Sequence, residues 1–210
     1  MNKDSMSIAV IDYGGGNIGS VVNALARLGY RPIVTASASV ILGSDAVFLP
    51  GVGAAADTMK RLSAAGIDES VRKLVESKKP LFAICVGLQV LLSETEENGE
   101  HECLGIIPGR VRKLPAGLKI PHMGWNQVKQ ACPHPIFSGI PDNTNFYFVH
   151  SYYALPQDSS VVAGTTEYGF QFCSMIIRDN LFATQFHPEK SGKFGLKMYS
   201  NFLKLAVKGS

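Results

Sequence analysis

Leu81-Phe82-Ala83-Ile84-Cys85-Val86-Gly87-Leu88-Gln89 joins a short apolar run to a segment that favours a helix. The first four residues predict a buried strand, and residues 86–92 predict the start of a helix. A cysteine between a strand and a helix N-terminus is typical of a nucleophile elbow, where a sharp turn pushes the side chain out of the sheet. Ala83 and Gly87, two positions before and after Cys85, are small enough for such a turn. A buried and inert cysteine would fit the same residues, so both interpretations stay open here.

An elbow at Cys85 would favour nucleophilic catalysis. The positive end of the following helix stabilises a thiolate, and the backbone amide of Val86 points to where an oxyanion would form. Upstream, another apolar run leads into Pro50-Gly51-Val52-Gly53, where two glycines allow an unusual backbone that exposes its amides. We therefore expect this loop, through Val52 and Gly53, to offer a second oxyanion donor. An ordinary strand-to-helix turn is the alternative.

The composition predicts one globular domain over residues 1–210, because 46% of the 210 residues are hydrophobic and only 18% are charged. The net charge of +3 is too small to indicate nucleic acid or an anionic membrane as a partner. The 4 cysteines form no Cys-x-x-Cys pair, so we expect no disulfide, no zinc site and no other metal or cofactor. No secretory signal or membrane-spanning apolar run is visible, which favours a soluble, cytoplasmic protein.

The first half of the sequence alternates short apolar runs with helical segments. Strands are predicted at 8–11, 33–34, 46–49 and 81–84, and helices at 18–28, 54–64, 68–77 and 86–92. Apolar strands that alternate with helices indicate a three-layer α/β fold around an open, mainly parallel sheet. The turn at 13–17 is rich in glycine, but it does not match the Gly-x-Gly-x-x-Gly spacing of a dinucleotide site, which is therefore disfavoured.

The second half of the sequence changes character. An acidic stretch at 94–102 is expected to be exposed, and strand-like runs separated by Gly and Pro turns follow at 106–111, 146–150, 152–155, 161–165 and 172–177. These runs predict an antiparallel extension of the sheet, not a second domain. The chain ends with an amphipathic helix at 194–207, whose apolar stripe we expect to pack on the sheet.

A cysteine nucleophile needs a base, and His187 is the best candidate among the 5 histidines. Residues two apart in an extended segment point the same way, so Glu189 can hold the His187 imidazole in its useful tautomer. Pro188 stiffens the link between them. His150 is the rival because it ends an apolar strand, but no carboxylate follows it. The remaining histidines stand in polar or turn contexts and are expected on the surface: His101, His122 and His134.

Three motifs, taken together and in this order, resemble the triad glutamine amidotransferases that have a cysteine elbow. They are Pro50-Gly-Val-Gly53, Ala83-Ile-Cys85-Val-Gly-Leu-Gln89 and Gln185-Phe-His187-Pro-Glu189. Four further stretches narrow the resemblance to the glutaminase subunits of imidazole glycerol phosphate synthases: Asp12-Tyr-Gly-Gly-Gly-Asn17-Ile-Gly-Ser20, Gly105-Ile-Ile-Pro-Gly109, Pro121-His-Met-Gly-Trp-Asn126 and Phe148-Val-His-Ser-Tyr152. The resemblance covers essentially the whole chain. Ala83 departs from the usual glycine of the family's elbow, and we expect the turn to survive because alanine is small.

The resemblance implies hydrolysis of glutamine to glutamate and ammonia. The catalytic triad of the family maps onto Cys85, His187 and Glu189. The backbone oxyanion donors map onto Val52, Gly53 and Val86. The residues that contact the substrate glutamine map onto Gln89, Ser151 and Tyr152.

The resemblance also implies a partner. In the family, a (β/α)8-barrel cyclase subunit forms a heterodimer with the glutaminase and receives its ammonia. The cyclase makes imidazole glycerol phosphate and an aminoimidazole carboxamide ribotide in histidine biosynthesis. Family positions near the interface match Asn17, Met123, Trp125 and Lys190. A core position for Trp125 and a solvated charge for Lys190 are the alternatives.

Three other functions stay open. A glutaminase that serves another synthase, such as one making pyridoxal phosphate, is disfavoured by the stretch 121–126. A thiol hydrolase acting on peptides or small electrophiles is disfavoured by Gln89 and by the His-Pro-Glu motif. A binding subunit that has lost its chemistry is disfavoured by the intact cysteine, histidine and glutamate.

Overall fold

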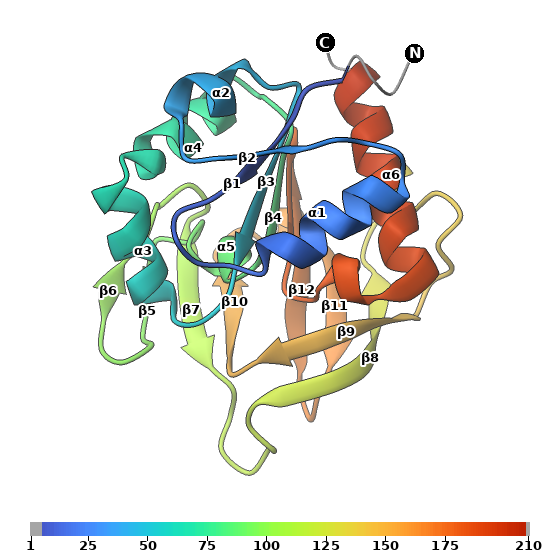
Figure 1. Cartoon of the computed structure of the whole chain (residues 1–210). Helices are drawn as coiled ribbons and strands as arrows, with labels where there is room; N and C mark the ends of the chain where they lie inside the picture. The colour runs from blue at the N-terminus through green and yellow to red at the C-terminus, as the bar shows by residue number, and fades with distance from the viewer. Residues whose placement is uncertain (1–5, 209–210) are drawn as a thin grey trace.

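Parallel strands form the centre of the computed structural model, which describes residues 6–208 (Figure 1). Their spatial order is β2-β1-β3-β4-β13. Their bounds are Ile8–Ile11 (β1), Ile33–Thr35 (β2), Ala46–Gly51 (β3), Leu81–Cys85 (β4) and Leu181–Thr184 (β13). Every residue of β1, β3, β4 and β13 is buried, which explains why these strands are short and almost uninterrupted apolar runs.

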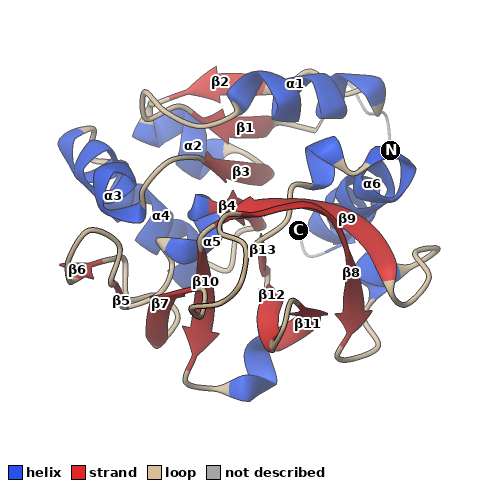
Figure 2. Ribbon diagram, turned by 90° about the horizontal axis from the view of Figure 1, so that it is seen from below, coloured by secondary structure: helices blue, strands red, loops and turns tan. Residues whose placement is uncertain are grey.

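Helices cover both faces of the parallel strands (Figure 2). One face carries α1 (Ile18–Arg27) and α6 (Gly192–Lys208). The other face carries α2 (Ala38–Gly43), α3 (Ala55–Ala64) and α4 (Ile67–Glu76), while α5 (Val86–Gln89) is a single turn directly after β4. The predicted three-layer α/β fold is therefore confirmed.

The antiparallel extension continues the sheet beyond β13. Next to β13 come β12, β10, β7, β5 and β6, and a second path runs from β12 through β11 and β8 to β9. The bounds are Glu94–Thr95 (β5), His101–Glu102 (β6), Gly109–Lys113 (β7), His122–Gln130 (β8), Thr144–His150 (β9), Tyr152–Pro156 (β10), Val162–Glu167 (β11) and Gln171–Arg178 (β12). Among the described residues, short 3-10 turns lie at Pro135–Phe137 (η2), Ser159–Val161 (η3) and Pro188–Lys190 (η4).

Helix α6 closes the core on its face of the sheet. Tyr199 and Phe202 of α6 meet Phe48 of β3 and Phe82 of β4 edge-on, and their ring centroids lie 5.0 to 5.3 Å apart. Each such pair adds about 0.5–1.5 kcal/mol beyond the burial of its area. The packing predicted for the C-terminal helix is thus confirmed, although the helix begins at Gly192, two residues before the predicted start.

Strand register brings three chain segments together at the carboxyl edge of the sheet. Gly51 of β3 pairs with Cys85 of β4, so the loop after Gly51 begins beside the cysteine. On the other side of β4, Thr184 pairs with Ile84. The segment after β13, which contains His187, therefore leaves the sheet next to the same elbow.

Two further predicted boundaries, at the end of the elbow helix and the start of the next strand, are corrected for one reason. The helix predicted over 86–92 ends at Gln89 because the carbonyls of residues 90–92 accept hydrogen bonds from the backbone amides of Leu104, Gly105 and Ile107. The segment 104–107, which donates these hydrogen bonds, is therefore not free to begin a strand at 106. The strand predicted over 106–111 instead occupies Gly109–Lys113.

The sequence-based prediction missed helix α2 and the strands β5, β6, β8 and β13. Helix α2 is six residues long, contains one serine and has a serine on each side of it, so it carries little periodic signal. Strand β8 has mostly exposed or half-buried side chains and lacks an apolar run. It forms because β9 and β11 both pair with it. None of the helices within residues 6–208 is long and apolar enough to cross a membrane.

Candidate active site

Cys85 has the backbone of a nucleophile elbow. Its φ of 56° and ψ of −108° are unusual for a residue with a side chain and store strain at the junction of β4 and α5. Tight packing around the elbow explains why glycine occupies positions 87 and 51, the second of which lies beside Cys85 on the neighbouring strand β3. A Cβ on Gly87 would lie 2.3 Å from the Leu49 carbonyl oxygen, and one on Gly51 would lie 2.5 Å from the Gly87 nitrogen. The elbow exists with Ala83 in place of the family's usual glycine, as expected.

We predict that Gly87→Ala destabilises the fold by at least about 3 kcal/mol, because the new Cβ would meet rigid backbone of β3 that cannot move aside. Urea unfolding followed by circular dichroism measures the loss. Gly19→Ala is the matched control, since nothing lies within 4 Å of a Cβ at this position in α1. Equal stability of the two variants would contradict the close approach of α5 to β3.

His187 and Glu189 form a buried pair beside the elbow. The Nδ1 atom of His187 lies 2.8 Å from Oε1 of Glu189, and both side chains are only 1% exposed. A carboxylate can only accept, so Nδ1 carries the hydrogen in this contact. Among the residues that the structure describes, Nε2 of His187 has no hydrogen-bond partner. The nitrogen that faces away from Glu189 is therefore available for reaction.

The electrostatics of His187 favour its protonated form. Burial alone would lower the pKa of the imidazole, but the neighbouring Cys85 sulfur and the Glu189 carboxylate outweigh it and raise the pKa to about 10. Protonated His187 beside a thiolate is the charge arrangement of an activated cysteine.

His150, the rival base, is engaged elsewhere. Its Nδ1–H donates to the Tyr152 carbonyl at 2.9 Å, and its Nε2 accepts from Nδ1–H of His122 at 2.9 Å. Burial lowers the pKa of His150 to about 3, so the ring stays neutral. The prediction that His122 lies on the surface is wrong. His122 is buried, stacks 4.0 Å from the Tyr168 ring, and has a pKa lowered by burial to about 4.

A cavity of about 240 Å³ opens at the elbow. This volume lies below the roughly 300–1,000 Å³ typical of sites for drug-sized ligands and fits a molecule the size of an amino acid. Most of the sequence-predicted site residues line it: Val52, Gly53, Cys85, Val86, Gln89, Ser151, Tyr152, His187 and Lys190. Glu189 is absent from the lining because it lies behind His187.

The sequence-based prediction missed Glu97, which lines the same cavity. Its stretch of acidic residues was expected to be exposed, but Glu97 is half-buried and accepts a 2.7 Å hydrogen bond from the Ala55 amide at the start of α3. Burial raises the pKa of this carboxyl. Nothing in the local composition distinguishes Glu97 from its acidic neighbours, so only the fold identifies it.

Gln185 is a second residue that the prediction missed as part of the site. Its Nε2 lies 3.6 Å from the Cys85 sulfur, and its Oε1 accepts from Nε2 of Gln89 at 3.1 Å. The Gln89 amide also donates to the Tyr152 carbonyl at 3.0 Å. These contacts use both N–H groups of Gln89, so the amide oxygen is the atom it can offer to a ligand.

The loop predicted to supply oxyanion donors lies beside Cys85. Val52 is 42% exposed, and Gly53 has a φ of +87°, a conformation that favours glycine. The phenol of buried Tyr13 lies close to the Val52 backbone, and burial raises the pKa of this phenol. The backbone of Val86, the residue after Cys85, begins α5.

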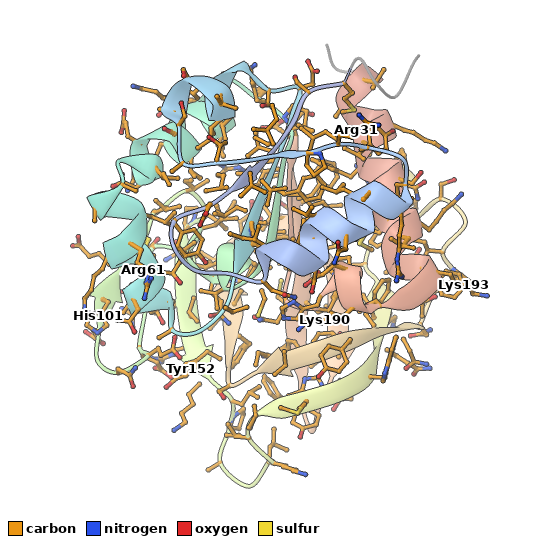
Figure 3. The ribbon with its side chains drawn as sticks, viewed as in Figure 1. Arg31, Arg61, His101, Tyr152, Lys190 and Lys193 are labelled. Atoms are coloured by element: carbon orange, nitrogen blue, oxygen red, sulfur yellow. The ribbon has the colours of Figure 1, made fainter. Side chains whose placement is uncertain are left out.

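Three of the four predicted interface residues lie on one surface patch, and Figure 3 shows Lys190 between α1 and β9. Met123 and Trp125 on β8 are 62% and 58% exposed, so Trp125 is not a core residue. Trp125 meets the Tyr147 ring edge-on at 6.2 Å, and the Lys190 ammonium lies 5.8 Å from the centre of that ring. We call Met123, Trp125, Tyr147 and Lys190 the rim patch.

Asn17, the fourth predicted interface residue, lies deeper than the rim patch. Its Nδ2 is 3.3 Å from Oε1 of Glu189, and its Oδ1 accepts from the Ser20 hydroxyl at 2.8 Å. Asn17 therefore contacts the carboxylate that holds His187. The sequence alone gave no sign of this contact.

Comparison with known proteins agrees with this geometry. The family model of class-I glutamine amidotransferases matches residues 9–206. A crystal structure of a glutamine amidotransferase has a TM-score of 0.74 at 21% identity and covers 95% of this chain and 98% of that chain. The structure of PurLQS from Thermotoga maritima has a TM-score of 0.74 at 18% identity, with the same coverage of both chains. Identities this low support the fold alone.

Two curated relatives are much more similar in sequence. Imidazole glycerol phosphate synthase subunit HisH of Dehalococcoides mccartyi strain CBDB1 is 58% identical over 200 residues, which are 95% of this chain and 98% of that protein. The protein of the same name from Moorella thermoacetica is 52% identical over 198 residues, 94% of each chain. The chain therefore belongs to the class-I glutamine amidotransferase family and, within it, to the HisH subunits of imidazole glycerol phosphate synthase.

Proposed function

We propose that this protein hydrolyses glutamine to glutamate and ammonia and supplies the ammonia to a cyclase subunit in histidine biosynthesis. The observation that carries the proposal is the cavity in which strained Cys85 and the Glu189-bound imidazole of His187 face the same space. Family membership supports the reaction class. The identity of the curated relatives favours this function over a glutaminase for another synthase.

In the first half of the reaction, the Cys85 thiolate attacks the carboxamide carbon of glutamine. A carbon–sulfur bond forms, and the carbonyl oxygen becomes an oxyanion that the backbone of Val86 and of the loop at Val52 and Gly53 would stabilise. Protonated His187 gives its Nε2 proton to the nitrogen of the substrate amide. The carbon–nitrogen bond then breaks, ammonia leaves, and a glutamyl thioester remains on Cys85.

In the second half, water attacks the thioester. His187 is now neutral and accepts a proton from this water through Nε2, while Glu189 stabilises the imidazolium that results. A second tetrahedral oxyanion forms and collapses with cleavage of the carbon–sulfur bond. Glutamate leaves, and the starting pair of thiolate and imidazolium is restored.

The cavity also provides groups for the charged end of glutamine. Glu97 places a carboxylate where it could pair with the substrate ammonium, and Lys190 places a cation at the same cavity for the substrate carboxylate. Gln89, with both of its N–H groups occupied, would accept a hydrogen bond from the substrate. Ser151 and Tyr152 line the same cavity.

We infer that the partner is a cyclase subunit with a (β/α)8-barrel that forms a heterodimer with this chain in the cytoplasm. The name of the relatives supports a synthase with more than one subunit. The rim patch supports the docking site, because exposed Trp125 and Met123 lie near the mouth of the cavity, which Lys190 also lines. Exposed aromatic and methionine side chains are enriched at protein interfaces.

We predict that His187→Asn lowers kcat nearly as much as loss of the nucleophile, because base and nucleophile act as one unit. Glu189→Gln should retain roughly 10²-fold more activity than His187→Asn, since Glu189 orients the imidazole but transfers no proton. Glutamate release assayed with the cyclase subunit and its ligand measures both effects.

His150→Asn is the matched control for this prediction. His150 is buried at the same cavity, but its ring is neutral and held between Tyr152 and His122. Its loss should lower kcat far less than His187→Asn does. A severe effect of His150→Asn together with a mild effect of His187→Asn would show that the base is wrongly assigned.

A further inference from the structure

The Glu189 carboxylate is buried and needs more than one partner. Removal of a carboxylate from water is costly unless hydrogen bonds replace the lost hydration. Its Oε1 accepts from His187 at 2.8 Å and from Asn17 at 3.3 Å. Its Oε2 accepts from the Tyr199 hydroxyl at 3.3 Å. The two oxygens thus have different partners, and Tyr199 is the one that holds the oxygen remote from the imidazole.

Tyr199 is itself rigidly held. Its side chain is fully buried in α6, and its ring packs edge-on against Phe48 at 5.0 Å and Phe82 at 5.2 Å. Burial, together with the adjacent Glu189 carboxylate, raises the pKa of the phenol well above its usual value. The hydroxyl therefore keeps its proton and donates to the carboxylate.

The hydroxyl has no packing role in this cluster. The ring contacts of Tyr199 are with phenylalanines of the central strands, where a phenylalanine at position 199 would pack equally well. A hydroxyl buried in an apolar cluster lowers stability unless it is hydrogen-bonded. The contact with Oε2 of Glu189 is the hydrogen bond that the structure gives it.

We propose that Tyr199 is a positioning residue of the triad. The terminal torsion of a glutamate has a broad, shallow energy profile, so a carboxylate held through one oxygen can swivel. The Tyr199 hydroxyl fixes Oε2 and thereby keeps Oε1 directed at Nδ1 of His187. Asn17, the residue directly before α1, donates to Oε1, and Tyr199 of α6 donates to Oε2. The carboxylate is therefore held from both helices. This inference rests on the glutaminase function proposed above.

Tyr199→Phe tests the proposal because it removes the hydroxyl and keeps the ring. We expect kcat for glutamate release, assayed with the cyclase subunit, to fall about tenfold with KM unchanged. A hydrogen bond to a charged group can account for about 10- to 100-fold, and the lower end applies because 3.3 Å is long for a hydroxyl donor. Wild-type kcat in the folded variant would overturn the proposal.

A double-mutant cycle separates positioning from packing. The phenol acts through the carboxylate, so Tyr199→Phe should have no further effect on kcat in a Glu189→Gln background. Phe202→Leu is the packing control, because Phe202 belongs to the same aromatic cluster. This substitution should lower the unfolding temperature by the same amount in the wild-type and the Glu189→Gln backgrounds. A tenfold loss from Tyr199→Phe in both backgrounds would assign Tyr199 a structural role and overturn the proposal.

A readout that needs no turnover keeps this inference separate from the proposed function. The Nδ1–H proton of His187 gives its own NMR signal, and we expect Tyr199→Phe to speed its exchange with solvent. If the wild-type protein released no glutamate in the presence of the cyclase subunit and its ligand, the proposed function would fail. An unchanged exchange rate in Tyr199→Phe would instead contradict the positioning of Glu189 by Tyr199.

Discussion

Replacement of Cys85 by alanine is expected to abolish glutamate release and leave the fold intact. In the proposed mechanism the sulfur forms the covalent bond to substrate, and loss of a catalytic nucleophile costs on the order of 10⁶ in kcat. The side chain is only 4% exposed and small, so alanine leaves at most a minor void at the elbow. Glutamate release with the cyclase subunit present, together with circular dichroism of the variant, measures both expectations.

The other three cysteines serve as controls. Burial raises the pKa of both Cys103 and Cys173 to about 12, which makes these thiols inert near neutral pH. Cys132 is exposed but lies outside the cavity. Cys132→Ser should therefore keep full activity. Full activity in Cys85→Ala would refute the triad.

The same substitution has a second consequence at His187. The Cys85 sulfur helps to raise the pKa of this imidazole to about 10. Burial lowers the pKa of His187, and without the sulfur only Glu189 opposes this effect. The pKa of His187 should therefore fall toward neutral pH in Cys85→Ala. NMR titration of His187 in Cys85→Ala measures this change. An unaltered pKa would mean that the sulfur and the imidazole are not coupled.

Glutaminase turnover is expected to be low in the isolated chain and to rise at least roughly hundredfold with the cyclase subunit and its ligand. That factor is the effect of one restored oxyanion donor, which typically accounts for 10²–10³ in rate. Val52 lies between two glycines, one of which has a φ of +87°, so its peptide groups can reorient at low cost. In one orientation the loop offers an amide to the oxyanion, and in the other it does not.

In the proposed complex, the rim patch would connect docking of the cyclase subunit to the loop at Val52. Lys190 belongs to the patch and lines the same cavity as Val52. Trp125→Ala should therefore weaken the stimulation by the partner more than it weakens folding. Ile33→Ala is the matched control, because Ile33 is similarly exposed but lies on β2 at the far edge of the sheet. Equal turnover with and without the liganded cyclase, at saturating glutamine, would refute control of turnover by reorientation of the loop at Val52. It would not affect the assignment of the triad.

The sequence predicts the parts of the site that depend on local order along the chain. The elbow at Cys85 follows from an apolar strand, small neighbours and a helix start, and the structure shows the strained backbone there. The spacing of two predicts the pairing of His187 with Glu189, and the structure shows the 2.8 Å contact. The reason differs, because Glu189 lies in the 3-10 turn Pro188–Lys190 and not in the extended segment that the prediction assumed. Both features depend on residues close in sequence, which is why local patterns are sufficient to find them.

Other parts of the site depend on contacts between distant segments, which local patterns do not encode. Glu97 lines the cavity because its loop returns over α3. His122 is buried because β8 pairs with β9 and places it opposite His150. Tyr199 looks like one more apolar residue on the stripe of a C-terminal helix, and only the packing of α6 brings its hydroxyl to Glu189.

Covalent labelling by a glutamine analogue that carries an electrophile tests the central claim most directly. We predict one adduct per chain by intact-mass measurement, located on Cys85 by peptide mapping and suppressed by excess glutamine. A simple alkylating reagent serves as the comparison and should label exposed Cys132 without protection by glutamine. An adduct of the glutamine analogue on Cys132, Cys103 or Cys173, with Cys85 unmodified in an active protein, would contradict the assignment of Cys85 as the nucleophile.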